Sequence, residues 1–175
     1  MMTLAETILM TQIGYENLLA KIAEKEKEYD QVRDHRQVAF ELSGDGWHDN
    51  PEFNRMQQLE ANLNHTLKTL NDRLDVMKFI DIHDGMRNVQ QVEIGSIVKL
   101  RRYDLADDSE TEEIWEIRGF DETNIKLKHL AYNAPLAEKI MHLHVADIAE
   151  EVQIGSRHFD IEVVALFKTR LLADI

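Results

Sequence analysis

Cysteine is absent from this chain of 175 residues, which excludes disulfide bonds, thiolate metal sites and cysteine nucleophiles. No uninterrupted apolar run reaches the roughly 18 residues that a membrane-spanning helix needs. Residues 1–10 contain Glu6 and lack the basic cluster that opens an export signal. These absences predict a soluble, cytoplasmic protein without a membrane partner.

Basic residues are fewer than acidic residues in this chain. The chain has 20 lysines and arginines against 33 aspartates and glutamates, which gives a formal net charge of -13. A surface of that charge repels the phosphate backbone, so we expect no free binding to nucleic acid. Any function on nucleic acid therefore requires a partner protein that brings the two together.

Proline and glycine are also scarce, with 2 and 7 in the chain. Neither occurs in residues 15–43 or residues 52–84, so we predict two long helices joined by a turn at residues 43–53. This arrangement is an antiparallel helical hairpin. A helix of about 30 residues rises about 45 Å, so the turn is expected to lie far from the base of the hairpin.

Apolar residues recur at alternating steps of three and four along both helices, which is the period of a coiled-coil seam. Lys25, Arg36 and Glu60 are the charged interruptions of this pattern. Because the two helices cover each other's seam, we expect a monomer. The predicted seam residues are Leu18, Ile22, Lys25, Tyr29, Val32, Arg36 and Ala39, then Phe53, Met56, Glu60, Leu63, Leu67, Leu70, Leu74 and Met77.

Each helix has a local start signal. Thr11 is a candidate N-cap of the first helix. Asn50 and Pro51 start the second, because proline suits the first helical position and an asparagine side chain accepts hydrogen bonds from the exposed amides. Between these helices the turn carries two acids, Asp45 and Asp49, which predicts negative charge at the tip of the hairpin.

The helical period stops at a polar junction over residues 80–88, and we divide the chain into residues 1–84 and residues 85–175. β-Branched and aromatic residues predict strands at residues 92–105, 113–120, 124–132, 151–154 and 158–167, with a helix at residues 135–143. The acidic segment 104–112 is expected to be a solvated loop. The fold class is α+β, a helical hairpin followed by a small α+β domain.

The turn reads Gly-Asp-x-x-x-Asp-Asn-Pro-Glu-Phe at residues 44–53, and shorter matches lie at residues 11–14, 79–81, 94–98 and 134–137. With these motifs in this order, nearly the whole chain resembles the GreA/GreB family of transcript cleavage factors. The resemblance implies an N-terminal coiled coil and an FKBP-like C-terminal domain that docks on bacterial RNA polymerase. It also implies that the coiled coil enters the polymerase secondary channel and helps to hydrolyse the 3′ end of backtracked RNA. Such a factor stimulates the polymerase and is not itself an enzyme.

Residue by residue, Asp45 and Asp49 match the two acids of the family tip. The resemblance implies that they hold the second catalytic Mg2+ jointly with the polymerase, so that the chain alone binds no cofactor stably. Carboxylate oxygens are suitable ligands for magnesium in phosphodiester hydrolysis. The candidate contacts with the polymerase or with the nascent RNA 3′ end are Trp47, His48, Asn50, Glu52, Arg33 and Arg36.

The tip departs from the family pattern, because three residues separate its acids where two are usual, and Glu41 replaces a usual arginine. Plainer interpretations also remain open. Asp49 or Asn50 serves only to cap the second helix, Trp47 folds back on the hairpin, and His48 faces solvent.

Three functions are consistent with these observations. The first is stimulation of transcript cleavage, and the second keeps the same scaffold and partner but blocks the channel as an inhibitor or regulator. The third is an unrelated role, as a coiled-coil adaptor or as a prolyl isomerase, which needs an aromatic-lined pocket. The aromatic residues available for such a pocket are explained more simply as strand core: Tyr103, Trp115, Phe120, Tyr132 and Phe159.

Overall fold

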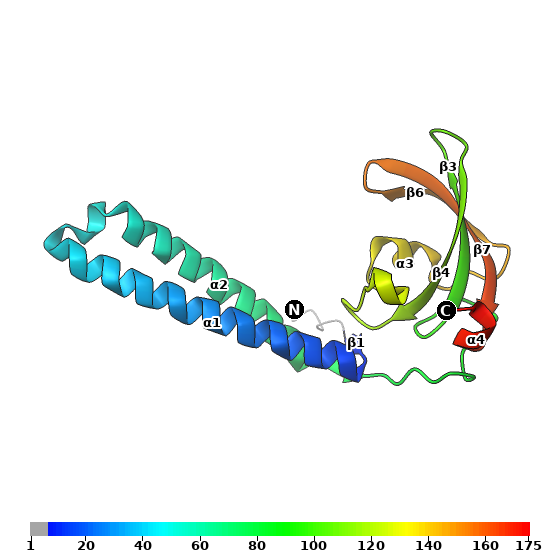
Figure 1. The fold of residues 1–175 in the computed structure, drawn as a ribbon, viewed down its shortest axis with the longest axis horizontal. Helices are drawn as coiled ribbons and strands as arrows, with labels where there is room; N and C mark the ends of the chain where they lie inside the picture. The colour runs from blue at the N-terminus through cyan, green and yellow to red at the C-terminus, as the bar shows by residue number, and fades with distance from the viewer. Residues whose placement is uncertain (1–6) are drawn as a thin grey trace, which may run out of the picture. The chain divides into compact units, whose positions relative to one another are not determined.

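The computed structural model describes residues 7–175 (Figure 1), so expectations for residues 1–6 lie outside it. The chain forms two compact units. The first contains Tyr15–Met77, and the second contains Leu9–Gly14 together with Lys78–Ile175. Within residues 7–175, no helix combines the length and the apolar character needed to cross a membrane.

The first unit is the predicted hairpin. Helix α1 spans Gln12–Ser43 and helix α2 spans Pro51–Val76, and the two lie side by side in Figure 1. At about 1.5 Å per residue they extend about 48 Å and about 39 Å. The predicted cap of α1 is confirmed, because the Gly14 amide donates a hydrogen bond to Thr11 Oγ1 at 3.3 Å.

The coiled-coil seam is also confirmed, since all of its predicted residues are buried or half-buried. Its charged positions have partners. Lys25 pairs with Glu28 on the same helix at 2.8 Å, and Arg36 pairs with Glu60 on the opposite helix at 2.8 Å. The Tyr29 hydroxyl donates to the same Glu60 carboxylate at 3.2 Å. Two of the three charged seam residues, Arg36 and Glu60, therefore neutralise each other across the hairpin, and the third, Lys25, is neutralised within its own helix.

The prediction that the second helix continues to residue 84 is wrong, because α2 ends at Val76. Met77–Phe79 form strand β2, which pairs with strand β1, Ile8–Met10, in a two-stranded sheet. The Ile80 amide continues this pairing and donates to the Met10 carbonyl at 2.9 Å. A segment without glycine or proline suits either a helix or a strand. Met77–Phe79 form a strand because they pair with Ile8–Met10, which are distant in the sequence. The sequence of residues 1–10 was consistent with an extra helical turn or with disorder, and its residues Ile8–Met10 form a strand instead.

The second unit is built on a five-stranded sheet of order β5-β4-β3-β7-β6. Neighbouring strands are antiparallel except β4 and β5, which are parallel. The strands are β3 Ile97–Asp104, β4 Glu110–Arg118, β5 His129–Ala131, β6 Ile148–Ile154 and β7 Arg157–Phe167. The helices are the 3-10 turn η2 Ile125–Leu127, α3 Pro135–Ile140 and α4 Arg170–Ala173. The predicted α+β class is confirmed.

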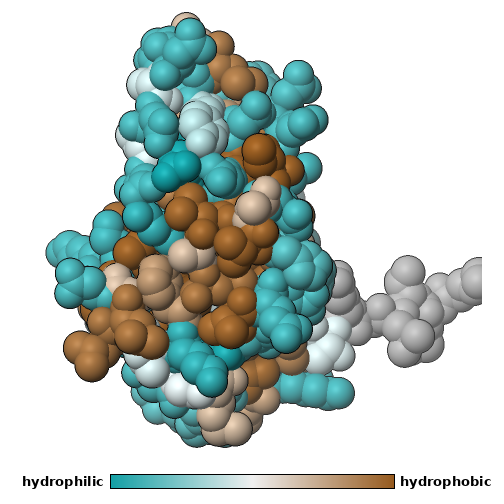
Figure 2. All heavy atoms as spheres, turned by 90° about the vertical axis from the view of Figure 1, so that its right-hand side faces the viewer, coloured by the Kyte–Doolittle hydropathy of each residue, from teal (hydrophilic) through white to brown (hydrophobic). Residues whose placement is uncertain are grey.

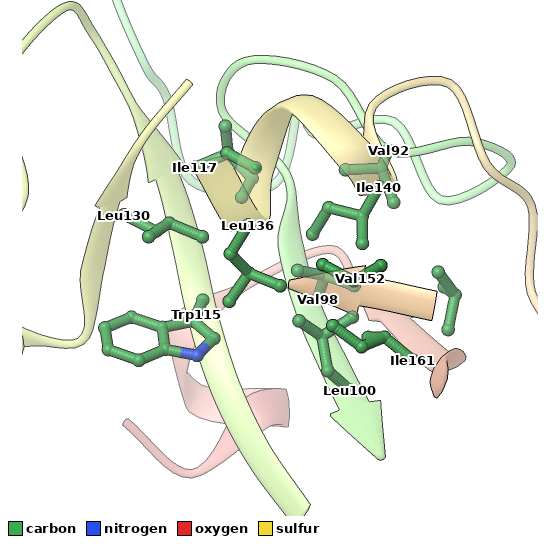
Figure 3. Packing of buried hydrophobic residues seen from close by; sticks show 12 residues of the cluster. Val92, Val98, Leu100, Trp115, Ile117, Leu130, Leu136, Ile140, Val152 and Ile161 are labelled. Atoms are coloured by element: carbon green, nitrogen blue, oxygen red, sulfur yellow. The ribbon is translucent and has the colours of Figure 1, made fainter. Parts of the chain in front are cut away.

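The core of this unit lies between α3 and the sheet. Figure 3 shows Leu136 and Ile140 of α3 pointing toward Val98 and Leu100 of β3. Trp115 belongs to the same cluster and is 8% exposed. Tyr132 and Phe159 pack against the cluster, as expected for residues of the strand core.

The prediction of a solvated loop over residues 104–112 is wrong at its end, because β4 begins at Glu110. Arg101 on the adjacent strand β3 pairs with Glu110 at 2.8 Å and with Glu112 at 2.9 Å. Opposite charges facing each other across a strand pair stabilise the sheet. The partners of these acids come from another strand, so the local sequence did not reveal them.

Candidate functional site

Within the predicted turn at residues 43–53, the tip of the hairpin forms a 3-10 helix, η1, over Gly44–Asp49. Gly44 has a positive φ of 54°, a conformation that glycine adopts without steric cost and that commonly ends an α-helix. At the other end the backbone of Asn50 is extended, as expected for the residue before Pro51. These two positions confine η1 between the helices.

Asn50 joins the three helical segments. Its Oδ1 accepts from the Glu52 amide at 2.9 Å and from the Phe53 amide at 3.4 Å, which caps α2. Its Nδ2 donates to the Ala39 carbonyl of α1 at 3.2 Å and to the Ser43 hydroxyl. The predicted capping role of Asn50 is confirmed, and Asn50 occupies the cap position in place of Asp49.

Trp47 folds back on the hairpin, one of the two alternatives left open by the sequence. Its ring centroid lies 5.0 Å from Phe53 of α2 and 5.8 Å from Phe40 of α1, and the two phenylalanine centroids are 6.2 Å apart. Tilted rings at these separations attract one another. We call Phe40, Trp47 and Phe53 the tip triangle.

Other acidic side chains near the tip already have partners. Glu52 pairs with Arg55 at 3.0 Å, and that hydrogen bond lowers the pKa of the Glu52 carboxyl. Glu41 accepts from Gln37 Nε2 at 2.8 Å. His48 is exposed, with its ring centroid 3.4 Å from that of Trp47.

Asp45 and Asp49 differ from these residues. Both are exposed, and within residues 7–175 neither carboxylate has a hydrogen bond or an ion pair. Their placement follows from the geometry of η1. A 3-10 helix has about three residues per turn and rises about 2 Å per residue, so residues four apart lie about 120° around the axis and about 8 Å along it. The two carboxylates therefore project from different faces of the tip.

Within residues 7–175, the tip does not form a complete metal site by itself. No three histidine, aspartate or glutamate side chains of residues 7–175 converge on a point where they could hold a metal ion. The oxygen chemistry of Asp45 and Asp49 fits magnesium, which commonly binds proteins through one or two carboxylates and keeps several waters. A metal ion at this tip would require further ligands from another molecule.

The two arginines named as candidate contacts with the polymerase or the RNA both form ion pairs within the hairpin. Arg33 lies 3.2 Å from Asp30, and its side chain is half exposed. Arg36 belongs to the seam through its pair with Glu60. Arg33 thus remains accessible, whereas Arg36 contributes to packing between the helices.

A buried ionic cluster in the second unit was missed from the sequence. The Glu116 side chain is 1% exposed, and it accepts from Arg118 at 2.9 Å and from Arg170 at 2.7 Å. Arg87 lies 3.4 Å from the same carboxylate. Burial acts to raise the pKa of Glu116, but the hydrogen bond from Arg118 and the charge of Arg87 outweigh it, so this pKa lies below its usual range. A glutamate between Trp115 and Ile117 in an apolar strand was the available signal.

Apolar side chains also gather on the surface of the second unit. Figure 2 shows them in the middle of one face, surrounded by hydrophilic residues. Met86 is 83% exposed and Leu171 is 88% exposed. Their segments are adjacent, because the Gly85 amide donates to the Lys168 carbonyl at 2.9 Å and the Arg170 amide donates to Asp84 at 3.2 Å.

Comparison with known proteins gives structural matches only. No protein-family model and no curated protein matches the chain. Among solved structures, Gfh1, a GreA factor homolog from Thermus thermophilus, is 18% identical, with 93% of this chain and 99% of that chain covered and a TM-score of 0.42. Gfh1 from Thermus aquaticus is 19% identical over the same shares, with a TM-score of 0.42. The elongation factor GreA/GreB from Nitrosomonas europaea is 16% identical over 91% and 97%, with a TM-score of 0.36. At these values the matches transfer no activity to this chain.

Proposed function

We propose that this chain is a transcription elongation factor that binds RNA polymerase and inserts its helical hairpin into the secondary channel. There it stimulates cleavage of backtracked RNA by the polymerase and carries no nuclease activity of its own. The tip motif that resembles the GreA/GreB family supports this proposal, as does the length of α1, about 48 Å at 1.5 Å per residue. An acidic protein of this kind would reach RNA through its protein partner.

The main observation behind the proposal is that Asp45 and Asp49 have no partners within residues 7–175. Asn50 and Ser43 are used in hydrogen bonds that build the tip, and Glu52 is paired with Arg55 on the surface of α2. Two unpaired carboxylates therefore remain on an ordered scaffold. That arrangement is suited to contributing ligands to a site that another molecule completes.

In the proposed mechanism, Asp45 and Asp49 have separate tasks because they lie on different faces of η1. One carboxylate binds at the second metal position of the polymerase, and the other accepts a hydrogen bond from the attacking water and orients it. When bound there, Mg2+ lowers the pKa of water and stabilises charge on the phosphate. His48, which is exposed beside Trp47, is proposed as a further contact with the RNA 3′ end.

The second unit is proposed to dock on the outer surface of the polymerase. Exposed apolar residues on a protein surface commonly mark interaction sites. Met86 and Leu171, on adjacent segments, provide such a surface in the second unit. Docking there would supply affinity, while the tip would supply the effect on catalysis.

A second candidate function is a channel-blocking regulator that does not stimulate cleavage. The observation that favours it is the separation of the two acids by about 120° and about 8 Å on the 3-10 helix. Two carboxylates so far apart cannot bind one metal ion together without unwinding η1. Glu41, in place of an arginine in the family pattern, also adds negative charge near the tip.

Cleavage of RNA in a stalled, backtracked elongation complex with magnesium tests the proposal. The double variant Asp45→Asn/Asp49→Asn is compared with Glu26→Gln/Asp34→Asn, which removes the same amount of charge from exposed positions on α1 away from the tip. Shortened transcripts with the wild type and the control, but not with the tip variant, are expected. Slowed nucleotide addition without any cleavage by the wild type would instead establish the channel-blocking function.

A further inference from the structure

The three faces of η1 have different roles. Residues three apart lie on one face of a 3-10 helix, so Gly44, Trp47 and Asn50 share a face. Trp47 and Asn50 are the half-buried residues among them, and both contact α1 and α2, so this face points into the hairpin. The two remaining faces carry Asp45 and Asp49, one on each.

Hydrogen bonds alone hold this segment weakly. The 3-10 helix has poor hydrogen-bond geometry, and the glycines at positions 44 and 46 give the backbone additional freedom. The carbonyls at the end of η1 accept two hydrogen bonds, Trp47 from the Asn50 amide at 3.2 Å and His48 from Asn54 Nδ2 at 3.3 Å. Asn50 in turn is bonded to Ala39 and Ser43 of α1, but no side chain of Gly44–Asp49 makes a hydrogen bond that holds η1 to the helices. The only large apolar side chain of η1 is Trp47.

We propose that Trp47 is a positioning residue for Asp45 and Asp49. By anchoring the inward face of η1 in the tip triangle, it keeps the two acids on separate outward faces. Three residues separate Asp45 from Asp49. Because η1 is helical, it spans this stretch at about 2 Å per residue, which is less than an extended chain would need. The functional consequence rests on the proposed action of these acids on RNA polymerase, whereas the ordering of the tip does not.

Three variants of the full chain test this inference. Trp47→Ala removes the anchor, Trp47→Phe retains an aromatic ring, and Leu42→Ala removes a large apolar side chain that is 84% exposed as a matched control. The first measurement is hydrogen exchange of the Asn50 amide in the free protein. We expect exchange to be about tenfold faster in Trp47→Ala and unchanged in Leu42→Ala, because the free energy of local opening falls with the loss of an aromatic pair.

The second measurement separates binding to RNA polymerase from the effect on its catalysis. Affinity for RNA polymerase and the effect on RNA cleavage or nucleotide addition at saturating protein are measured for the same variants. Trp47→Ala should bind within about twofold of the wild type, while its effect at saturation falls between about 10-fold and 100-fold, as expected for misplaced reacting groups. Trp47→Phe should recover most of this loss.

Two results would overturn the inference. Unchanged exchange at Asn50 in Trp47→Ala would show that the ring does not order the tip. A loss of affinity with an unchanged effect at saturation would make Trp47 a contact residue for the polymerase instead. If the wild type does not bind polymerase at all, the proposed function fails, but the exchange measurement still decides whether Trp47 orders η1.

Discussion

The guanidinium of Arg36 on α1 lies 2.8 Å from the carboxylate of Glu60 on α2, so charged residues of the two seams neutralise each other. The Tyr29 hydroxyl donates to the same carboxylate at 3.2 Å. A shift of one helix along the other would separate these groups. The cluster therefore selects one register of the hairpin and thereby fixes where its tip forms.

Loss of the Glu60 carboxylate should destabilise the hairpin. Glu60→Ala leaves Arg36 without its partner in the seam, and we expect the free energy of unfolding to fall by about 1.5 to 3 kcal/mol, the range for hydrogen bonds to charged groups. Asp72→Ala is the control, because it breaks an ion pair with Lys68 whose side chains are more than half exposed. That variant should lose less than about 0.5 kcal/mol. Equal losses in urea unfolding would contradict the role of Glu60.

Close packing around Glu122 should make Gly119 intolerant of a side chain. Glu122 accepts from the Thr11 amide and from the Thr11 hydroxyl, both at 2.8 Å. A Cβ at position 119 would meet the Glu122 carboxylate and lie 2.9 Å from the Met10 Cα atom. Gly119→Ala should therefore cost about 1 to 3 kcal/mol of unfolding free energy.

Gly46 provides the matched control for this experiment. A Cβ added at Gly46 has no atom within 4 Å. The Gly46→Ala variant should stay within about 0.5 kcal/mol of the wild type, as surface substitutions do. Thermal unfolding of both variants checks the pair, and a Gly119→Ala variant as stable as Gly46→Ala would show that the backbone near Met10 moves aside.

Stability should fall in mild acid because of His129. Arg170 donates to His129 Nε2 at 2.7 Å, so this nitrogen is an acceptor and the ring is neutral. Burial and the charge of Arg118 lower the pKa of His129 below its ordinary value of 6.5, although Glu116 opposes the shift. The unfolded chain thus binds a proton at a pH where the folded chain does not. The stabilising contribution is present above pH 6.5 and is lost as the pH falls toward the lower pKa of the folded state.

The variant His129→Gln isolates this effect. The chain has 8 histidines, and the others contribute equally to both proteins. From about pH 7.5 to about pH 5.5, the free energy of unfolding should decrease less in His129→Gln than in the wild type. Urea unfolding measures this free energy. An equal decrease in both proteins would show that His129 does not cause the loss of stability at low pH.

Local patterns in the sequence predicted the hairpin, its seam and the α+β class, because helix periodicity and strand residues report burial directly. The end of α2 was missed because Met77–Phe79 pair with β1, about 70 residues earlier in the chain, and pairing at that separation leaves no local signal. The partners of Glu116 were hidden for the same reason, since Arg87 and Arg170 come from distant segments.

At the tip, the sequence identified the unpaired acids and the cap Asn50 but not the geometry that relates them. Glycines at positions 44 and 46 indicated a turn without defining its conformation. The structure has a 3-10 helix there because Trp47 finds two aromatic partners, one on each long helix. Such a contact depends on the register of α1 against α2, which residue spacing alone does not define.

If the second unit docks through its exposed apolar surface, a change there should alter the affinity for RNA polymerase but not the effect on catalysis at saturating protein. A charge on this surface, as in Leu171→Glu, should lower the affinity for RNA polymerase about tenfold or more, since burial of a charge opposes docking. Leu171 is 88% exposed, so the change should not unfold the protein. The effect at saturating protein should be unchanged. Unaltered affinity would place the docking surface elsewhere.

The most direct test of the proposed function is the position of the tip in the elongation complex. A photo-crosslinking residue replaces Gly46, which has open space around it, in a complex stalled with a labelled RNA 3′ end. The control position is Asn71, an exposed residue on α2 about 30 Å along the helix from the tip. Crosslinking of the RNA 3′ end from position 46 but not from position 71 is the predicted result. A complex that contains the protein but gives no crosslink from position 46 would contradict the proposal that the hairpin delivers Asp45 and Asp49 to the polymerase active site.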